Sequence, residues 1–410
     1  MSEILFLSHR IPFPPDRGDK IRSHHLLRRL AALAPVHVAT FADDEADAAS
    51  EVELALLARS WRLVRRAKAL PLAGLAALAR RQPVSLAAFH DRRLAEYVEQ
   101  TLRLHPITTI FVFSGQMGQY VPASFKGRVI VDFVDVDSAK FDAYADAARW
   151  PMNRVHAREG RLLRLEESRL AQRADVSLLI SPDEATLFRT RMHEPLGADV
   201  RVLGNGIDTQ AFDPVMTEPE PRLAALSGPP LIFTGQMDYP PNVAAVVRAA
   251  TRIMPLVRSH IPDATFHIVG RRPTAQVQAL HGINGCHVWG RVDDVRPWLR
   301  GADLALVPLE IARGVQNKVL EAMAMALPVV ASAEAATGIA ATPGRDLALA
   351  RSDADLAMAA VSLLLDRPRA RAKGLAARRF VEHHHNWAAV LAPVAGLVAA
   401  PLRPGARRAA

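Results

Sequence analysis

The strongest constraint on the fold of this chain is a repeated alternation of short apolar runs with longer helical stretches. In the first half, the runs with strand character are Ile4–Ser8, Val36–Phe41, Thr109–Phe113, Arg128–Val134, Val176–Ile180 and Val200–Leu203. The helical stretches include Lys20–Leu33, Asp44–Arg66 and Met152–Arg173. Nearly continuous apolar strands separated by helices are typical of a parallel sheet covered on both faces. The pattern therefore predicts a doubly wound α/β domain.

The second half repeats this pattern and predicts a second domain of the same class. Its strand candidates are Leu231–Thr234, Thr265–Val269, His287–Trp289, Leu304–Val307 and Pro328–Ala331. Residues 213–230, rich in Pro, Glu and Gly, indicate a linker ahead of the second sheet. We expect Rossmann-like domains over residues 1–212 and 213–374, then a helix returning to the first domain and a disordered tail over residues 375–410.

The chain carries a formal net charge of +9, but its pattern does not favour nucleic-acid binding. Arginine is spread along helical stretches rather than gathered in one run, and no nucleic-acid-binding motif is recognised. A basic surface also suits anionic lipid headgroups and polyprenyl pyrophosphates, so peripheral contact with a membrane stays open. Residues 67–89 are apolar with a basic edge, which indicates either an outer helix packed on the sheet or a lipid-facing flap.

The cellular compartment is indicated by the absence of recognisable membrane-spanning and secretion segments and by the low cysteine content. No run approaches the roughly 18 apolar residues that span a bilayer, and no N-terminal secretion signal is recognised. The single cysteine, Cys286, fits a reducing compartment. We therefore expect a soluble cytoplasmic protein, which could also bind peripherally to the inner face of the cytoplasmic membrane.

Residues 314–332 contain the most informative motif, in which a glycine turn leads into a helix and then into a proline-started strand. Lys318 and Glu321 are three residues apart and share a helix face near the helix start. A cation beside free backbone N–H groups suits a phosphate, and a carboxylate one turn later suits ribose hydroxyls. The pair predicts a site for a nucleotide diphosphate, although the motif alone also fits an ordinary exposed Lys–Glu pair.

Several other site types are not supported. There is no G-x-G-x-x-G after a strand, no G-x-x-x-x-G-K-[ST] and no H-E-x-x-H, which argues against nicotinamide dehydrogenases, P-loop NTPases and zinc proteases. His383, His384 and His385 are consecutive, so they cannot share one helix face to bind a metal. The stretch Ser181–Glu184 indicates a helix-capping turn.

The Lys318 motif belongs to an ordered series of segments that carries a family resemblance. Upstream lie residues 231–242, 266–271, 288–294 and 302–309. This succession resembles the nucleotide-binding half of the retaining, group-one GT-B glycosyltransferases. With residues 5–22, 135–138 and 312–318 added, the chain is similar to the sugar transferases associated with PEP-CTERM/exosortase exopolysaccharide loci. The resemblance covers nearly the whole chain and implies two Rossmann-like domains facing each other across a cleft.

The resemblance implies a donor site in the second domain. Its residues would be Gly235, Gln236, Arg271, Gly314, Asn317, Lys318 and Glu321. Glu321 would bind the ribose hydroxyls and Lys318 the pyrophosphate of a nucleotide-diphosphate sugar. The residues expected to take part in catalysis are Lys318, Arg313 and Asp135. The nucleotide sugar is a substrate, so no cofactor is expected.

Three departures from the wider family involve four positions. Arg313 stands where a glutamate commonly contacts the donor sugar, and a guanidinium has hydrogen-bond donors only. Gln236 and Tyr239 replace the common Arg and Lys that follow the first strand of the second domain. Val134 replaces a common histidine of the first domain. These departures concern the donor and the chemistry more than the fold.

The resemblance also implies an acceptor site in the first domain. Its residues would be Gly18, Asp19, Arg22, Asp132, Asp137 and Ser138, with Asp135 beside them. Gly18 is expected to give a sharp turn, and a plain capping loop is the alternative for residues 14–22. Asp135-Val136-Asp137 resembles a metal-binding D-x-D, but that motif belongs to a different transferase fold, so we expect no metal.

Taken together, the sequence predicts a retaining hexosyltransferase. It would transfer a sugar from a nucleotide-diphosphate donor to a glycan or polyprenyl-linked acceptor in exopolysaccharide assembly. Two alternatives stay open: a nucleotide-sugar epimerase of the same fold, and a nucleotide-sugar-binding protein without catalytic activity. The missing glutamate and histidine favour the second alternative over the first.

Overall fold

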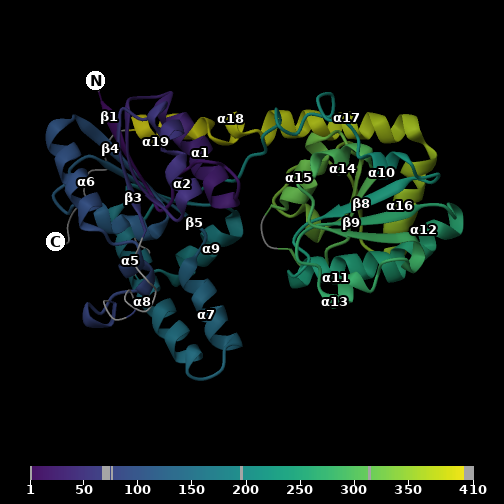
Figure 1. Cartoon of the computed structure of the whole chain (residues 1–410), viewed down its shortest axis with the longest axis horizontal. Coiled ribbons are helices and arrows are strands. Elements are labelled where there is room, and N and C mark those ends of the chain that lie inside the picture. Colours follow the sequence, from purple (N-terminus) through teal and green to yellow (C-terminus); the bar gives the residue numbers. More distant parts are fainter. Residues whose placement is uncertain (1, 67–73, 75–76, 194–196, 313–314, 401–410) are drawn as a thin grey trace. The chain divides into compact units, whose positions relative to one another are not determined.

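The computed structural model describes residues 2–66, 74, 77–193, 197–312 and 315–400. The chain divides into two compact units (Figure 1). The first unit is Met1–Gly204 together with Leu391–Ala410, and the second is Asn205–Val390.

The first unit is built on a parallel sheet of seven strands in the order β3-β2-β1-β4-β5-β6-β7. The strands are β1 (Glu3–Ser8), β2 (Val36–Ala42), β3 (Ser60–Arg65), β4 (Ile107–Phe113), β5 (Arg128–Val134), β6 (Val176–Leu179) and β7 (Val200–Val202). All neighbouring strands run parallel. The six strands predicted for this half are present, with ends within two residues of those expected, and the α/β class is confirmed.

Helices of the first unit connect these strands. They are α1 (Gly18–Ala31), α2 (Glu45–Ala49), α3 (Glu51–Ala55), α5 (Val84–Ala88), α6 (Arg92–Leu104), η1 (Gly115–Tyr120), α7 (Asp137–Ala147), α8 (Met152–Arg173), α9 (Pro182–Arg191) and α19 (Ala392–Ala399). Val98 of α6, Leu170 of α8 and Phe188 of α9 join Val112 of β4 in one buried cluster. Burying these apolar side chains holds the helices on the sheet.

One helix prediction is wrong, because residues 44–66 do not form a single helix. After α2 and α3 the chain enters β3, the edge strand, which pairs with β2. Arg62 and Arg65 of β3 are exposed and Val64 is buried. Exposed arginines are common on edge strands. Over so short a segment, the spacing of exposed and buried residues does not distinguish a strand from an amphipathic helix.

The second unit has its own parallel sheet, with six strands in the order β10-β9-β8-β11-β12-β13. They are β8 (Pro230–Thr234), β9 (Thr265–Val269), β10 (Cys286–Gly290), β11 (Leu304–Val307), β12 (Val329–Ser332) and β13 (Ala348–Ala350). The five predicted strands are present, and β13 is an additional short strand at the edge. The predicted pair of parallel-sheet domains is therefore confirmed.

Helices of the second unit are mostly short. They are α10 (Pro221–Ala224), α11 (Pro240–Arg248), η2 (Ala249–Ile253), α12 (Met254–His260), α13 (Ala275–Gln278), η3 (Ile283–Gly285), α14 (Arg296–Gly301), α15 (Asn317–Ala324), η4 (Glu334–Ala336), α16 (Asp353–Leu365), α17 (Arg367–His384) and α18 (Trp387–Val390). Leu320 and Met323 of α15 join Phe233 of β8 and Leu306 of β11 in the core of this unit. This packing fixes the start of α15 relative to the sheet.

Both sheets have a point at which the strand order reverses. In the first unit the chain builds outward from β1 through β2 to β3, and then from β4 in the other direction. In the second unit β8 and β11 have the same relationship. Open α/β sheets bind ligands at such points, outside the carboxyl ends of the strands. We therefore expect ligand sites at the loops after β1, β4, β8 and β11.

The two units meet in the sequence between Gly204 and Asn205, and the boundaries at 212/213 and 374/375 stay predictions. Helix α17 continues through residues 374 and 375. Helix α19 belongs to the first unit and packs against α1. Residues 401–410, predicted to be a disordered tail, lie outside the described part of the chain.

Two further expectations concern membranes. None of the described helices is both long enough and apolar enough to cross a bilayer. The stretch of residues 67–89, a candidate outer helix or lipid-facing flap, lies partly outside the described residues. At its described end, Leu86 and Phe89 are only 6% exposed and pack into the core.

Candidate functional site

Two glycines meet at the carboxyl edge of the second unit's sheet. Gly235 follows β8 with a φ of +156°, and Gly270 follows β9 with a φ of +159°. A Cβ atom at residue 270 would lie 1.6 Å from the carbonyl oxygen of Gly235. A Cβ atom at residue 235 would lie 2.9 Å from Nδ2 of Asn242 and 3.3 Å from Cε of Lys318. Because glycine has no side chain, the two loops can approach each other closely and leave room for Lys318.

Lys318 reaches this edge from the first turn of α15. Its Nζ donates to Oε1 of Gln316 at 3.2 Å and lies 5.4 Å from the ring centre of Phe233. Both of these contacting groups are uncharged. Asn317, the first residue of α15, is exposed. The free N–H groups of a helix start, next to a lysine and a glycine, are typical of phosphate sites.

The electrostatics of Lys318 and Glu321 are coupled. Burial lowers the pKa of Lys318 to about 8, and the charge of Glu321 opposes this shift. Burial raises the pKa of Glu321, and the charge of Lys318 opposes that shift in turn. The two side chains therefore share one half-buried environment, as their spacing predicts. An anion bound beside Lys318 would favour its charged form.

Other predicted donor residues lie in the same place. Oε1 of Gln236 accepts from Arg271 at 3.2 Å, and the carbonyl oxygen of Gln236 accepts from Nδ2 of Asn242 at 2.9 Å. Oδ1 of Asn242 is buried and has no hydrogen-bond partner among the described residues. The structure thus brings Gln236 and Arg271 together beside Gly235. Arg313 and Gly314 lie outside the described residues.

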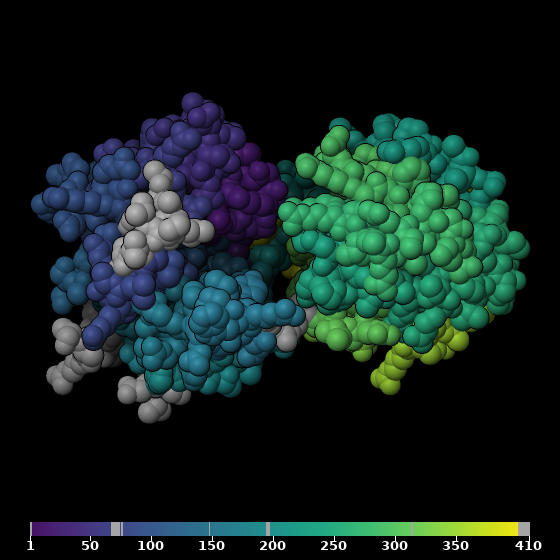
Figure 2. Space-filling view, turned by 60° about the horizontal axis from the view of Figure 1, so that its bottom comes forward, coloured from purple at the N-terminus to yellow at the C-terminus, as the bar shows by residue number. Residues whose placement is uncertain are grey.

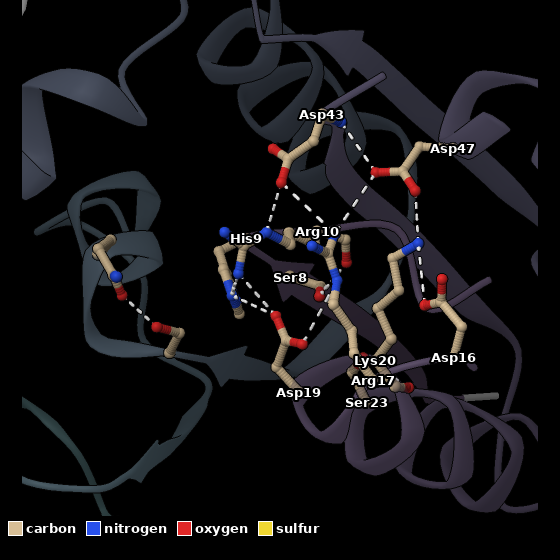
Figure 3. A network of polar contacts seen from close by, with 12 residues as sticks. Ser8, His9, Arg10, Asp16, Arg17, Asp19, Lys20, Ser23, Asp43 and Asp47 are labelled. Carbon is tan, nitrogen blue, oxygen red and sulfur yellow. Dashed lines mark hydrogen bonds and ion pairs between the residues drawn. The ribbon is translucent and has the colours of Figure 1, made fainter. Parts of the chain in front are cut away.

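At the carboxyl edge of the first unit's sheet, Asp19 is part of a dense polar network (Figure 3). Its Oδ2 lies 2.7 Å from Nη1 of Arg10 and 3.2 Å from Nε2 of His9. Burial alone would raise the pKa of Asp19, but the hydrogen bonds and charges of His9 and Arg10 outweigh it and hold this pKa well below its ordinary value. Arg10 also binds Asp43 at 2.6 Å. The network continues through Ser8, Asp16, Arg17, Lys20, Ser23 and Asp47.

Arg22 and Asp132 do not have the exposed position that direct acceptor binding requires. Nε of Arg22 donates to Asp132 at 2.8 Å, and its terminal nitrogens donate to the carbonyl oxygens of Leu203 at 2.7 Å and Gly204 at 2.6 Å. Arg22 is 1% exposed and Asp132 is fully buried. These two residues therefore tie α1 and β5 to the end of β7. Contact with an acceptor would require this buried cluster to open.

Gly18 differs from its expected role as a sharp turn. It is the first residue of α1 and is not one of the glycines with a positive φ. A Cβ atom added to it would have no atom within 4 Å. The position therefore tolerates a side chain, and its backbone belongs to an ordinary helix start.

Ser138 is also buried, and its hydrogen bonds are directed inward. Its backbone N–H donates to Oε1 of Glu167 at 2.9 Å and its hydroxyl donates to Oε2 at 2.6 Å. Nε of Arg191 donates to the same hydroxyl at 3.1 Å. Burial raises the pKa of Glu167 to about 7, against the hydrogen bonds from Ser138. Ser138 therefore positions the start of α7 rather than offering a surface to a ligand.

Asp135 and Asp137 remain partly exposed after β5. Lys140 binds both carboxylates, Asp135 at 2.9 Å and Asp137 at 3.2 Å. A lysine ammonium held between two carboxylates occupies the place that a cation would take. The pair thus offers carboxylate oxygens to hydroxyl groups near the switch point of the first sheet.

His9, for which no role is predicted from the sequence, lies directly after β1 at the switch point. Its ring stacks on Phe113 with ring centres 5.7 Å apart and meets Phe89 edge-on at the same distance. Its Nδ1 is buried and has no hydrogen-bond partner among the described residues. Burial lowers the pKa of His9, and the hydrogen bond with Asp19 opposes the shift. Its position after the first strand of a doubly wound sheet is a signal that could have identified it.

Backbone strain marks the neighbouring strand ends. Ser114, after β4, has a φ of +75°, and Val134, at the end of β5, has a φ of +69°. Residues other than glycine rarely adopt such values, and a β-branched valine does so less readily still. Strained backbone is concentrated at functional sites, so both positions support a site at this edge.

The residues described include one group with the geometry to hold a metal ion, at the opposite edge of the first sheet. It consists of Glu3, His37 and His105. The Glu3 carboxylate lies 2.8 Å from His37, 3.2 Å from His105 and 3.3 Å from Arg59. These neighbours already satisfy the buried carboxylate, so a structural polar cluster accounts for the arrangement.

Comparisons with known proteins find similarity between part of the second unit and a known family. Residues 228–366 match the profile of the family described as glycosyl transferases group 1. A phosphatidyl-myo-inositol mannosyltransferase of Propionibacterium freudenreichii is 28% identical over 165 residues, which cover 40% of each chain. An alpha-maltose-1-phosphate synthase of Mycolicibacterium smegmatis is 30% identical over 211 residues, which cover 46% of this chain and 54% of that one. The chain thus spans about half the length of the curated relatives that it matches.

Solved structures show the fold of the whole chain. The Anabaena protein HepE, in complex with UDP and glucose, superposes with a TM-score of 0.61 at 16% identity. The match covers 98% of this chain and 100% of that one. Together with the two parallel sheets, this likeness shows the GT-B fold that the sequence predicts.

Proposed function

We propose that this protein, whose residues 228–366 match the group 1 glycosyl transferase family and whose two units have the GT-B fold, is a hexosyltransferase. It transfers a sugar, with retention of anomeric configuration, from a nucleotide-diphosphate donor to a glycan or polyprenyl-linked acceptor. The observation that carries the proposal is the position of Lys318 between the start of α15 and the close pair of loops at Gly235 and Gly270.

We propose that the donor binds with its diphosphate beside Lys318. Gly235 lets the backbone approach the phosphates, and Gln236 and Arg271, already hydrogen-bonded to each other, line the same loop. Glu321, one turn beyond Lys318, accepts hydrogen bonds from the ribose hydroxyls. A UDP sugar is the first donor to test, because the structural neighbour HepE holds UDP and glucose.

The reaction breaks the bond between the anomeric carbon and the diphosphate oxygen and forms a bond to an acceptor hydroxyl oxygen. The electron pair of the broken bond goes to the diphosphate, whose new negative charge Lys318 and the N–H groups of α15 stabilise. The leaving phosphate takes the proton of the acceptor hydroxyl. Arg313, with donors only, would bind the diphosphate or an acidic sugar, and Gly314 would keep the loop close to the phosphates.

On the acceptor side, the proposal relies on the carboxylates that remain partly exposed. Asp19, Asp135 and Asp137 can accept hydrogen bonds from acceptor hydroxyls at the switch point of the first sheet. Arg22 and Asp132 hold the loops that present these residues. The mannosyltransferase relative is named for a phosphatidyl-inositol substrate, which supports an acceptor with a lipid portion.

We place the activity in exopolysaccharide assembly, in the cytoplasm or at the inner face of its membrane. The family resemblance of residues 5–22 and 312–318 to transferases of PEP-CTERM/exosortase loci supports this role. The basic surface of the chain supports contact with anionic lipids.

The proposal is tested with purified full-length protein and radiolabelled UDP-glucose, UDP-galactose and GDP-mannose, each offered with polyprenyl-pyrophosphate-linked sugars. We expect transfer from one donor, and at least a tenfold loss of turnover in Lys318→Ala, equivalent to about 1.4 kcal/mol of transition-state stabilisation. Lys126→Ala, which removes an exposed lysine of the first unit, is the matched control and should keep full activity.

Two results would contradict the proposal. The first is near-normal turnover in Lys318→Ala, which would remove the donor site from this edge of the sheet. The second is a chain that is stabilised by UDP in a thermal shift assay but transfers no sugar from any donor. That result would favour a nucleotide-sugar-binding protein without catalytic activity.

A further inference from the structure

The helical hairpin of α7 and α8 carries an unusual concentration of exposed apolar side chains at its tip. The two helices are antiparallel neighbours, and Figure 1 shows them extending away from the sheet of the first unit, with the connecting turn at the far end. Trp150, in this turn, is 79% exposed. Tyr144 near the end of α7 is 53% exposed, and Met152 and Val155 in the first turn of α8 are each 47% exposed.

The base of the same hairpin is an ordinary packed structure. Leu163 and Leu170 of α8 are at most 5% exposed. Closer to the tip, the rings of Phe141, Tyr144 and His156 contact one another with centres 5.7 to 6.0 Å apart. These contacts hold the two helices together close to the tip, and Trp150, Met152 and Val155 lie exposed at the end of this packed hairpin.

The charges around the tip are predominantly positive. The exposed charged residues between positions 144 and 161 are Asp146, Arg149, Arg154 and Arg161. Arg149 directly precedes Trp150, and Arg154 follows two residues after Met152. Figure 2, which brings the lower side of Figure 1 forward, shows the blue-green atoms of this hairpin at the surface of the first unit.

We propose that this tip is a docking surface for an anionic lipid bilayer, with Trp150 and Met152 entering the headgroup region and Arg149 and Arg154 binding lipid phosphates. Tryptophan prefers the membrane interface because its ring is apolar and its N–H is polar. Arginine beside it adds attraction to anionic headgroups. A protein partner would fit an apolar tip equally well, but the excess of arginine over aspartate favours a negatively charged surface.

The docking surface is independent of sugar transfer, because it lies on the hairpin and includes none of the residues proposed to bind donor or acceptor. A failed vesicle experiment would leave the proposed transferase activity standing. Equally, an inactive chain would still bind lipid through this tip.

The first experiment measures flotation of the full chain with vesicles of phosphatidylglycerol and phosphatidylethanolamine, and with vesicles of phosphatidylcholine alone. We expect binding to the anionic vesicles and at least tenfold weaker binding to phosphatidylcholine. The double variant Trp150→Ser with Met152→Ser, and the double variant Arg149→Gln with Arg154→Gln, should each weaken binding to anionic vesicles at least about tenfold.

Matched controls separate the tip from general apolar or basic surface. Val215 and Met216 of the second unit are 87% and 82% exposed, so Val215→Ser with Met216→Ser removes an equally exposed apolar pair elsewhere. Arg103→Gln with Arg291→Gln removes two exposed arginines outside the hairpin. Both controls should bind vesicles like the wild type, and all variants should melt at the wild-type temperature because the changed side chains are exposed.

A second measurement tests insertion directly. Brominated lipids should quench part of the tryptophan fluorescence of the wild type, and Trp150→Phe should lose that quenched fraction while keeping its binding. Wild-type protein that stays unbound with anionic vesicles, or tip variants that bind like the wild type, would overturn the proposal. Self-association that depends on the tip, without vesicle binding, would also overturn it in favour of a protein partner.

Discussion

Nε of Arg22 donates to Oδ2 of Asp132 at 2.8 Å, and neither side chain is more than 1% exposed. The same guanidinium donates to the carbonyl oxygens of Leu203 and Gly204, the last residues of the first unit before the chain enters the second. One buried cation thus satisfies a carboxylate of β5 and two backbone carbonyls beyond β7. Its role is to fix the path of the chain where the first unit ends.

Replacing Arg22 by alanine should destabilise the protein strongly. The change leaves the Asp132 carboxylate buried without its partner, which costs about 3–5 kcal/mol. Chemical denaturation monitored by circular dichroism measures the loss. The control is Arg201→Ala, which removes a 54%-exposed arginine from its ion pair with Asp199, and should cost less than about 1 kcal/mol. Equal effects of the two variants would contradict the structural role of Arg22.

The close contact between Gly270 and Gly235 predicts a second strong effect. In Gly270→Ala the new methyl group would meet the carbonyl oxygen of Gly235, at a φ of +159° that alanine rarely adopts. We expect a loss of at least about 2 kcal/mol of stability, together with weaker UDP binding.

Gly18→Ala is the matched control for the glycine substitution. An added Cβ atom there has no neighbour within 4 Å, and the residue is the first of α1. Stability should stay within about 1 kcal/mol of the wild type, since alanine favours a helix over glycine. UDP titrations and thermal melts of both variants provide the comparison. A Gly270→Ala variant as stable as Gly18→Ala would show that the two loops can separate.

The sequence predicts the sheets well because buried parallel strands are apolar along their whole length. The prediction is wrong at β3, which was expected to be part of a helix. Arg62 and Arg65 are exposed on this edge strand, and only the pairing of β3 with β2 makes the segment a strand rather than a helix. Arg22 and Ser138 could not be placed correctly from the sequence for the same reason, since their surroundings depend on distant residues. Whether a polar side chain after a strand faces a ligand or a buried partner depends on residues far away in sequence, such as Leu203, 181 positions from Arg22.

The arrangement of the residues predicted to bind the donor was easier to predict, because it depends on local geometry. Lys318 and Glu321 are fixed relative to each other by one helix turn, and Gly235 by the end of one strand. His9 was equally predictable from its position after the first strand. Its pairing with Asp19, ten residues later, required the fold of residues 10–18 to bring the two side chains together.

The lowered pKa of Lys318 predicts a pH dependence for the transferase reaction. Burial brings this pKa to about 8, so the free enzyme loses the ammonium charge as the pH rises through 8. We expect kcat/KM, which reports groups of the free enzyme, to fall above about pH 8. In Lys318→Arg the decline should move to higher pH, because arginine stays charged. An unchanged decline in that variant would assign it to another group, and Lys126→Arg serves as the control.

The last prediction concerns Glu167, whose buried carboxyl group holds the start of α7 through Ser138. Burial raises its pKa from an ordinary 4.5 to about 7. Between pH 4.5 and 7 the folded protein therefore binds more protons at this site than the unfolded chain does, and the contribution of Glu167 to stability falls as the pH rises. The limit of this loss is about 3.5 kcal/mol, since the pKa rises from 4.5 to about 7 and each pKa unit corresponds to about 1.4 kcal/mol.

Glu167→Gln removes the titration and keeps nearly the same shape. Relative to the wild type, the variant should gain stability as the pH is raised from 5 to 7, and the gain should level off above about pH 7. Thermal or urea denaturation at several pH values gives this difference directly. Glu166→Gln, which changes the neighbouring carboxylate that pairs with Arg169, should show no such gain. A Glu167→Gln difference that stays constant from pH 5 to 8 would mean that this carboxyl group is already ionised at pH 5, with its charge balanced by Ser138 and Arg191.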